Sequence, residues 1–207
     1  EAVKIVKSGD WVDYGWCANH PRVLDKALAE RMIKEPSLTD LKFRGGVALW
    51  MPEVAKIPNA KEQMCVNFWH ASGYERKLTD NGIGYYAPLR FSELPRNYRD
   101  NIKHVDVTFI QVAPMDKHGY FNFGLSASDI AAVIEVSEKV VVEVNPLMPV
   151  VLGGTEVSVH IDDVDFIVEN EGIPMADLPS GVPSEIDEAV AKLIVPEIPN
   201  GACLQLG

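Results

Sequence analysis

The hydrophobic positions of the chain fall into short runs that alternate with turn residues. Six runs are rich in β-branched and aromatic residues, which is typical of buried strands: residues 11–15, 41–50, 64–69, 105–112, 139–144 and 164–168. Arg44-Gly45-Gly46 interrupts the second run. A turn punctuated by Pro114, Asp116 and Gly119 follows the fourth run, and residues 120–123 then alternate aromatic positions like a further short strand.

Helical periodicity lies between these runs. Apolar residues recur at helical spacing in residues 23–32, and Pro21 fits the first position of this helix with Asn19 or His20 as its cap. Residues 128–136 predict another helix. Strands that alternate with helices predict an α/β fold, a mostly parallel sheet with flanking helices.

The last part of the chain resembles the start of a second domain. Residues 170–183 hold three Pro and two Gly, which is typical of a linker. Ser184-Glu185-Ile186-Asp187 then begins a helix with a capping box, and residues 202–206 predict a strand that ends at Gly207. The helix, Gly turn, strand and Gly repeat the order of residues 1–15. We therefore expect one domain over 1–183, and in 184–207 the first helix and strand of a second, similar domain that is truncated here.

Charge narrows the class of partner. The 207 residues include 30 acidic and 19 basic side chains, for a net charge of −11. This balance argues against nucleic acid or an anionic membrane as the main partner, although backbone N–H groups or a local basic patch can still hold a small anion. A local basic excess does occur within residues 76–103.

Cysteine usage and hydropathy indicate the cellular compartment and argue against metal sites and membrane-spanning helices. Cys17, Cys65 and Cys203 are scattered and form no C-x-x-C motif, which favours a reducing, cytoplasmic compartment without disulfides or a zinc site. The spacing of His, Asp and Glu resembles no metal site, so no metal is expected. No run reaches 18 uninterrupted apolar residues, so no membrane-spanning helix is expected.

Two polar clusters follow predicted strands, where α/β sheets place their ligands. Trp16, Cys17 and His20 follow the first strand. Cys17 could act as a nucleophile with His20 as its base, or these residues could line a pocket. His70 and Arg76 follow the third strand; Arg76 could bind a carboxylate in a bidentate manner, or belong to a solvated loop or an interdomain salt bridge.

Several longer phrases resemble the acetyl-CoA hydrolase/transferase family, and within it butyryl-CoA:acetate and 4-hydroxybutyrate CoA-transferases. The phrases are SGDWVDYGWC at 8–17, ERK at 75–77, SELPRNYR at 92–99, HVDVTFIQVAPMDKHGYFNFG at 104–124, EVN at 143–145 and EIPNGACLQLG at 197–207. The resemblance implies a fold of the CoA-transferase (NagB/RpiA-like) type. Some 4-hydroxybutyrate-type members carry His where Trp16 stands, which puts an imidazole role at that position in doubt.

The family implies transfer of CoA between an acyl-CoA and a free carboxylate, through a glutamyl-CoA thioester. The catalytic glutamate is expected beyond Gly207, so no catalytic residue is assigned within the chain and the isolated fragment is expected to be inactive. Gln205 and Gly207 are expected to bind CoA, with Gln205 as possible oxyanion support. An ordinary strand end is the alternative for both.

Further expectations follow from the same resemblance. CoA is expected as a substrate rather than a permanently bound cofactor, and the partners are an acyl-CoA, a short-chain carboxylate and the remainder of the polypeptide in a homo-oligomer. A thioester hydrolase and a non-catalytic interaction domain remain as alternatives.

Overall fold

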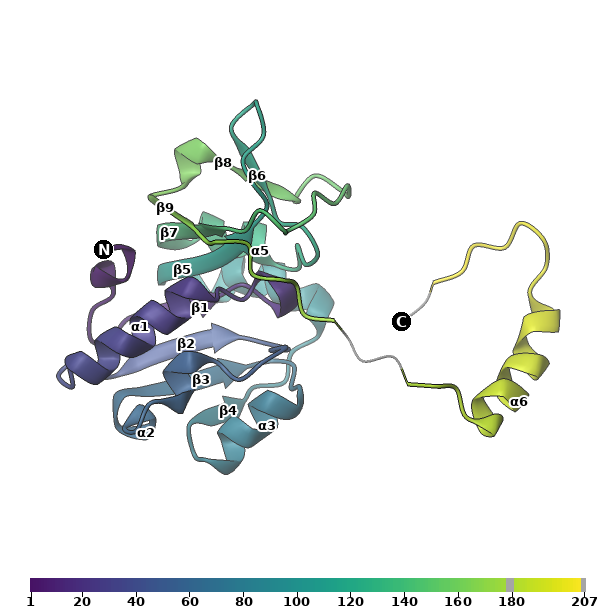
Figure 1. The fold of residues 1–207 in the computed structure, drawn as a ribbon, viewed down its shortest axis with the longest axis horizontal. Helices are drawn as coiled ribbons and strands as arrows, with labels where there is room; N and C mark the ends of the chain where they lie inside the picture. The colour runs from purple at the N-terminus through teal and green to yellow at the C-terminus, as the bar shows by residue number, and fades with distance from the viewer. Residues whose placement is uncertain (178–180, 206–207) are drawn as a thin grey trace. The chain divides into compact units, whose positions relative to one another are not determined.

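The computed structural model describes residues 1–177 and 181–205, and the chain divides into two compact units, Glu1–Ala176 and Asp177–Gly207. The first unit is built on one sheet (Figure 1), whose strands have the order β4-β3-β2-β1-β5-β7-β9. Every neighbouring pair in this sheet is parallel. The bounds are β1 Trp11–Tyr14, β2 Leu41–Gly45, β3 Met64–Phe68, β4 Gly84–Tyr86, β5 Val105–Val112, β7 Ser137–Val144 and β9 Phe166–Glu169. The predicted α/β fold with a mostly parallel sheet is confirmed.

The strand order reverses between β1 and β5. The chain runs outward from β1 to β4, returns to the centre as β5 and then continues outward to β9 on the other side. β1 and β5 are neighbours in register, with Tyr14 opposite Phe109. In open α/β sheets, ligands bind beyond the carboxyl ends of the strands at such a reversal. The loop after β1 therefore lies at the expected site position.

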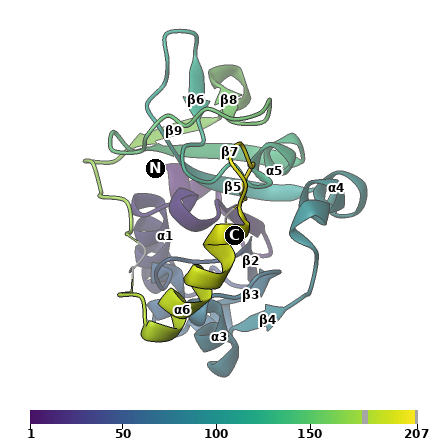
Figure 2. The same ribbon diagram turned by 90° about the vertical axis from the view of Figure 1, so that its right-hand side faces the viewer.

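Helices cover both faces of the sheet (Figure 2). Phe109 packs in a core cluster with Leu28 and Met32 of α1, whereas the next residue, Ile110, packs with Ile130 of α5. Adjacent strand residues point to opposite faces, so α1 and α5 lie on opposite sides. The helices of this unit are α1 Val23–Lys34, α2 Ala60–Gln63, α3 Gly73–Asp80, α4 Leu94–Asn97 and α5 Ile130–Glu135.

Three sequence predictions need correction or refinement within this unit. The strand expected over 41–50 ends at Gly45, because the chain leaves the sheet at Gly46 and Val47 takes a left-handed φ of 48°. The helix expected after Pro21 begins at Val23, and neither Asn19 nor His20 caps it. The strand expected over 120–123 forms as β6 Tyr120–Asn122, but it pairs outside the main sheet, antiparallel to β8 Ser158–His160.

The second unit contains α6, Glu185–Ile194, which begins with the predicted capping box between Ser184 and Asp187. The predicted strand over 202–206 is wrong for its described part, since residues 202–205 have no regular secondary structure. A strand needs a neighbour for its N–H and C=O groups, and none of the described residues supplies one there. Leu206 and Gly207 lie outside the described residues. No helix in the described part of the chain is long and apolar enough to cross a membrane.

Candidate functional site

The loop after β1 is fixed by side chains from the strands beside it. The Gln111 amide of β5 donates to the Ala18 carbonyl at 2.7 Å. In return, the Asn19 amide donates to the Gln111 carbonyl at 2.8 Å. Asn145 donates to the Gln111 side-chain oxygen at 2.9 Å and holds this amide in place. All three side chains are fully buried, so the loop is held by a polar network that solvent does not compete for.

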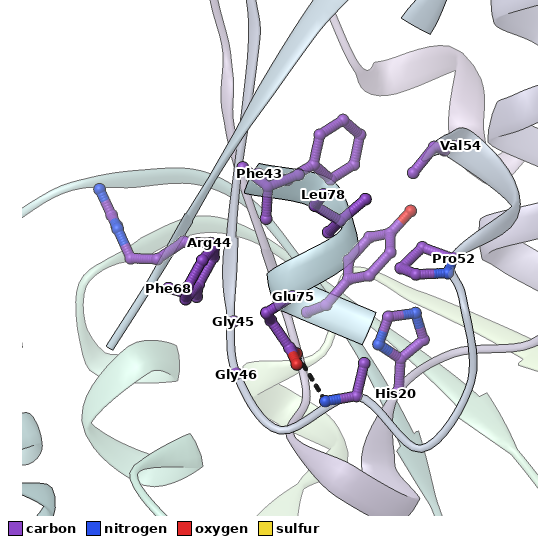
Figure 3. Close-up of a pocket in the computed structure, with 13 residues that line it drawn as sticks. His20, Phe43, Arg44, Gly45, Gly46, Pro52, Val54, Phe68, Glu75 and Leu78 are labelled. Carbon is purple, nitrogen blue, oxygen red and sulfur yellow. Dashed lines mark hydrogen bonds between the residues drawn. The ribbon is translucent and has the colours of Figure 1, made fainter. Parts of the chain in front are cut away.

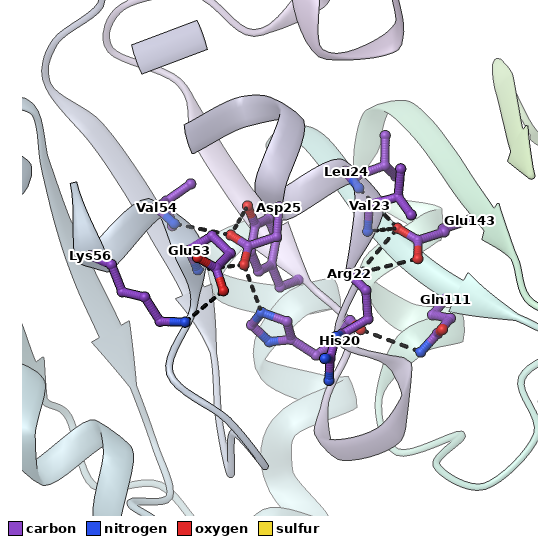
Figure 4. Close-up of polar contacts among 11 residues, drawn as sticks. His20, Arg22, Val23, Leu24, Asp25, Glu53, Val54, Lys56, Gln111 and Glu143 are labelled. Carbon is purple, nitrogen blue, oxygen red and sulfur yellow. Dashed lines mark hydrogen bonds and ion pairs between the residues drawn. The ribbon is translucent and has the colours of Figure 1, made fainter. Parts of the chain in front are cut away.

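Glu143 of β7 supplies the cap of α1 (Figure 4). Its carboxylate accepts the backbone N–H groups of Arg22, Val23 and Leu24 at 2.9–3.1 Å, and the Asn170 amide at 3.0 Å. The first N–H groups of a helix have no partner within the helix, and the helix N-terminus favours a negative charge. A cap more than 100 residues away in sequence is not visible to local patterns; its sequence signal was the EVN phrase at residues 143–145.

His20 and Asp25 form a buried pair beside this cap (Figure 4). The Asp25 carboxylate accepts the Glu53 N–H at 2.6 Å and the Tyr14 hydroxyl at 3.2 Å, and burial raises its pKa to about 6. His20 Nε2 lies 4.0 Å from this carboxylate. Burial and then Arg22 lower the pKa of His20 to about 3, so its imidazole is neutral at physiological pH.

A small pocket, with a cavity volume of about 40 Å³, opens beside His20 at the carboxyl ends of β1, β2 and β3 (Figure 3). Most of its lining is apolar: Tyr14, His20, Phe43, Arg44, Gly45, Gly46, Ala48, Pro52, Val54, Val66, Phe68, Glu75 and Leu78. The buried Glu75 carboxylate accepts the Ala48 N–H at 2.6 Å and the Ser72 N–H at 2.8 Å. It therefore ties the loops after β2 and β3 together. The mostly apolar lining suits a small apolar group better than a charged one.

Arg44 lines the pocket with its stem, while Figure 3 shows its guanidinium directed away from the other lining residues. The guanidinium pairs with Asp13 at 3.3 Å and lies 4.0 Å from the Trp11 ring centroid. Arg44 as a whole residue is 6% exposed. Tyr98 donates its hydroxyl to the same carboxylate. Burial raises the pKa of Asp13 against the opposite effect of Arg44. This buried pair links the carboxyl ends of β1 and β2.

An aromatic cluster forms the wall beyond Gly46. Trp16 stacks on Trp69 with a centroid separation of 6.3 Å and meets the rings of His70 and Phe91 edge-on at 5.6 and 5.9 Å. A Cβ on Gly46 would lie 2.8 Å from the six-membered ring of Trp16. Glycine is therefore required there for the close approach of the loops after β1 and β2. The two polar clusters predicted from the sequence meet at Trp16 and His70.

The remaining predicted site residues that the structure describes do not line the pocket, although Cys17 packs against the aromatic cluster that contains Trp16. Cys17 is half-buried, takes a left-handed φ of 49°, and has a thiol pKa raised by burial, so it is the protonated thiol at neutral pH rather than an activated nucleophile. Arg76 is exposed on α3 and is not among the pocket-lining residues. Gln205 is exposed in the second unit, and Gly207 lies outside the described residues. Binding roles for these residues stay predictions.

Comparison with known proteins agrees with this architecture. The model of the acetyl-CoA hydrolase/transferase N-terminal domain matches residues 1–179. The chain is 55% identical over 208 positions to a butyryl-CoA:acetate CoA-transferase of Anaerostipes caccae, which covers all of this chain and 46% of that protein. It is 33% identical over 161 positions to a 4-hydroxybutyrate coenzyme A transferase of Clostridium kluyveri, across 76% of this chain and 37% of that one.

A solved structure shows the same fold. RipA from Yersinia pestis superposes with a TM-score of 0.88 at 28% identity, over all of this chain and 49% of that one. The predicted CoA-transferase type of fold is thereby confirmed. The chain spans about half the length of the relatives it matches. On the match over residues 1–179, the chain belongs to the acetyl-CoA hydrolase/transferase family.

Proposed function

We propose that this chain is the acyl-binding half of a CoA-transferase that moves CoA between a short-chain acyl-CoA, butyryl-CoA or 4-hydroxybutyryl-CoA, and acetate. The apolar pocket at the carboxyl ends of β1, β2 and β3 carries the proposal. It lies beyond the carboxyl ends of the strands, on the β2 side of the strand-order reversal between β1 and β5, near which this class of sheet binds ligands. Its apolar lining suits the hydrocarbon part of a short acyl group. Relatives named as butyryl-CoA:acetate and 4-hydroxybutyrate transferases support the substrate class.

The proposed chemistry has two covalent steps. A glutamate carboxylate attacks the thioester carbonyl, which forms an acyl-glutamyl anhydride and releases the CoA thiolate. The thiolate then attacks the glutamyl carbonyl, which forms a glutamyl-CoA thioester and releases the original acyl group as a carboxylate. Acetate attacks the glutamyl-CoA thioester and the same steps run in reverse. The nucleophilic glutamate is placed outside residues 1–207.

The ionisable groups of the pocket support a binding role over a nucleophilic one. Glu75 is the carboxylate among the described lining residues, and two backbone N–H groups occupy it. His20 is neutral and its Nε2 faces Asp25. Glu75 holds the loops after β2 and β3 in place around the acyl group. Gln205 and Gly207 are proposed to contact CoA from the second unit.

The second unit is proposed to begin a second, similar domain. None of the described residues of α6 is buried, and its Ile186, Val190 and Leu193 are exposed at helical spacing. An amphipathic helix of this kind covers its apolar face with a further element of the protein. In this proposal, residues 184–207 are the first part of that domain.

Trapping of the covalent intermediate tests the proposed function. The intact protein is incubated with butyryl-CoA, treated with borohydride, and examined by peptide mass spectrometry. We expect loss of activity together with reduction of one glutamate outside residues 1–207. Full transferase activity from residues 1–207 alone would contradict the proposal, because it would require a nucleophile within them. Thioester consumption that does not depend on acetate would favour the hydrolase alternative. An intact protein without activity would favour the non-catalytic interaction domain.

Steady-state transferase kinetics of the intact protein test the pocket. Val66→Leu adds one methylene to the lining, so the preference for hexanoyl-CoA relative to butyryl-CoA should fall about tenfold in kcat/KM. Val168→Leu is the matched control. It makes the same change at the partly buried residue of β9, which lies outside the pocket lining. An equal change of preference in both variants would place the acyl group elsewhere.

A further inference from the structure

The amino edge of the sheet, opposite to the proposed acyl pocket, carries a group of metal-ligating side chains. One ligand atom from each of His104, Asp106 and Glu138 lies within 4.8 Å of the other two. His104 and Asp106 lie at the beginning of β5, and Glu138 lies at the beginning of the neighbouring strand β7. The parallel register, with Val105 opposite Ser137 and Val107 opposite Lys139, brings these two strand ends together.

The Asp106 carboxylate is already oriented by the backbone. Its Oδ2 accepts the Trp11 N–H of β1 at 2.7 Å, which leaves Oδ1 directed to His104 Nε2 at 2.9 Å. Metal-ligating carboxylates and imidazoles are held in this way by hydrogen bonds from the surrounding protein. Asp106 is therefore held in one orientation, unlike a freely rotating surface carboxylate.

The charges around this group also favour binding of a cation. Asp106 and Glu138 line a hollow of about 240 Å³ at the surface, together with Asp10. Lys7 and Lys139 line it as well, but the Lys139 ammonium is engaged by Asp165 at 2.8 Å. Because carboxylates outnumber the ammonium groups that face them, a bound cation would lower their mutual repulsion.

A second His-x-Asp pair in the same chain shows what the third ligand adds. His160 and Asp162 have the same spacing, and their ring nitrogen and carboxylate lie 3.2 Å apart. No third histidine, cysteine or carboxylate joins this pair within the described residues. The chain thus contains a complete three-ligand group and an otherwise similar two-ligand pair.

We propose that His104, Asp106 and Glu138 bind a divalent first-row transition-metal ion of the zinc type. One imidazole and two carboxylates match the nitrogen and oxygen donors that zinc and its neighbours accept, with water completing the coordination. The ion takes the place of the proton between His104 and Asp106. It links the starts of β5 and β7 and, through the Asp106–Trp11 hydrogen bond, the start of β1. Its role is structural and independent of acyl transfer.

Cobalt binding tests the site. The intact, untagged protein is treated with chelator and titrated with Co²⁺, which gives visible absorption when bound by protein ligands, and Zn²⁺ is then added as a competitor. We expect one Co²⁺ per chain, displaced by Zn²⁺, and a rise in Tm when Zn²⁺ binds. His104→Ala and Glu138→Gln should each weaken binding by at least about tenfold. His160→Ala is the matched control and should bind as the unaltered protein does.

Two results would overturn the proposal. One is the absence of stoichiometric Co²⁺ binding by the unaltered protein. The other is equal binding by Glu138→Gln and the unaltered protein, since Glu138 is exposed and its replacement by an isostere leaves the fold intact. The metal-free circular dichroism of each variant verifies its folding, and Glu138→Gln decides the question if His104→Ala folds poorly.

Discussion

Two buried carboxylates near the loop after β1 have opposite surroundings. Glu143 is 0% exposed and accepts hydrogen bonds from three backbone N–H groups and the Asn170 amide. Asp129 is 2% exposed, and neither of its oxygens has a hydrogen-bond partner among the residues that the structure describes. Asp129 instead lines a small cavity of about 10 Å³ together with Gly15 and Trp16. A buried charge stabilises a fold only when hydrogen bonds replace its lost water, so we expect the two residues to affect stability in opposite directions.

Removal of Glu143 should have the largest effect. Glu143→Ala leaves the buried N–H group of Leu24 and the partly buried N–H groups of Arg22 and Val23 without an acceptor, so the free energy of unfolding should fall by about 4 kcal/mol. Urea unfolding of the intact protein measures the change. Glu143→Gln keeps an acceptor oxygen and should lose about half as much. A loss in the alanine variant no larger than that of an exposed substitution would show that the cap does not hold α1.

Neutralising Asp129 should have the opposite sign. Burial raises the pKa of Asp129 from 3.8 to about 6, so the folded state binds this proton more tightly than the unfolded state does. The stability from this group is therefore complete at pH values below 3.8 and is lost as the pH rises through about 6. Asp129→Asn should raise the free energy of unfolding by roughly 2 kcal/mol at pH 8 and by little at pH 4.

The contribution of Asp129 is obtained from the difference in free energy of unfolding between Asp129→Asn and the unaltered protein at each pH. Burial also raises the pKa of Asp25 to about 6, and both proteins retain that group. Unfolding curves at pH 4, 6 and 8 supply the measurement. A destabilised Asp129→Asn protein at pH 8 would mean that a partner of the carboxylate compensates its charge, and the contrast with Glu143 would then fail.

The sequence predicted the sheet because its signal is local. Runs such as residues 105–112 are mostly apolar, as expected of strands buried on both sides, and they form β5 and its parallel neighbours. The cap of α1 was not predictable in this way. Pro21 suggested a local cap at Asn19 or His20, but Glu143 of β7 supplies it from across the sheet. Only the fold brings those residues together.

The site was predicted in part for a similar reason. Strand ends located Trp16 and His70 on neighbouring loops, and their rings do meet. The pocket beside His20 depends on Phe43, Val54 and Leu78, apolar residues from separate elements that carry no motif. Glu75 matched the family phrase ERK, and its role in joining two loops becomes visible only through the Ala48 N–H. Gln205 and Gly207 stay predictions.

An exposed carboxylate completes the comparison and should have the smallest effect. Arg99 binds both oxygens of Glu135 at 2.6 and 2.7 Å and reaches Glu156 at 3.0 Å, yet about a third or more of each side chain is exposed. Water screens such pairs, so Arg99→Gln should lower the free energy of unfolding by less than about 1 kcal/mol. In 1 M NaCl the Debye length shrinks to about 3 Å, and the difference should nearly vanish. A loss that matched Glu143→Ala, or that persisted at high salt, would mean that bidentate geometry rather than burial decides what a carboxylate contributes in this fold.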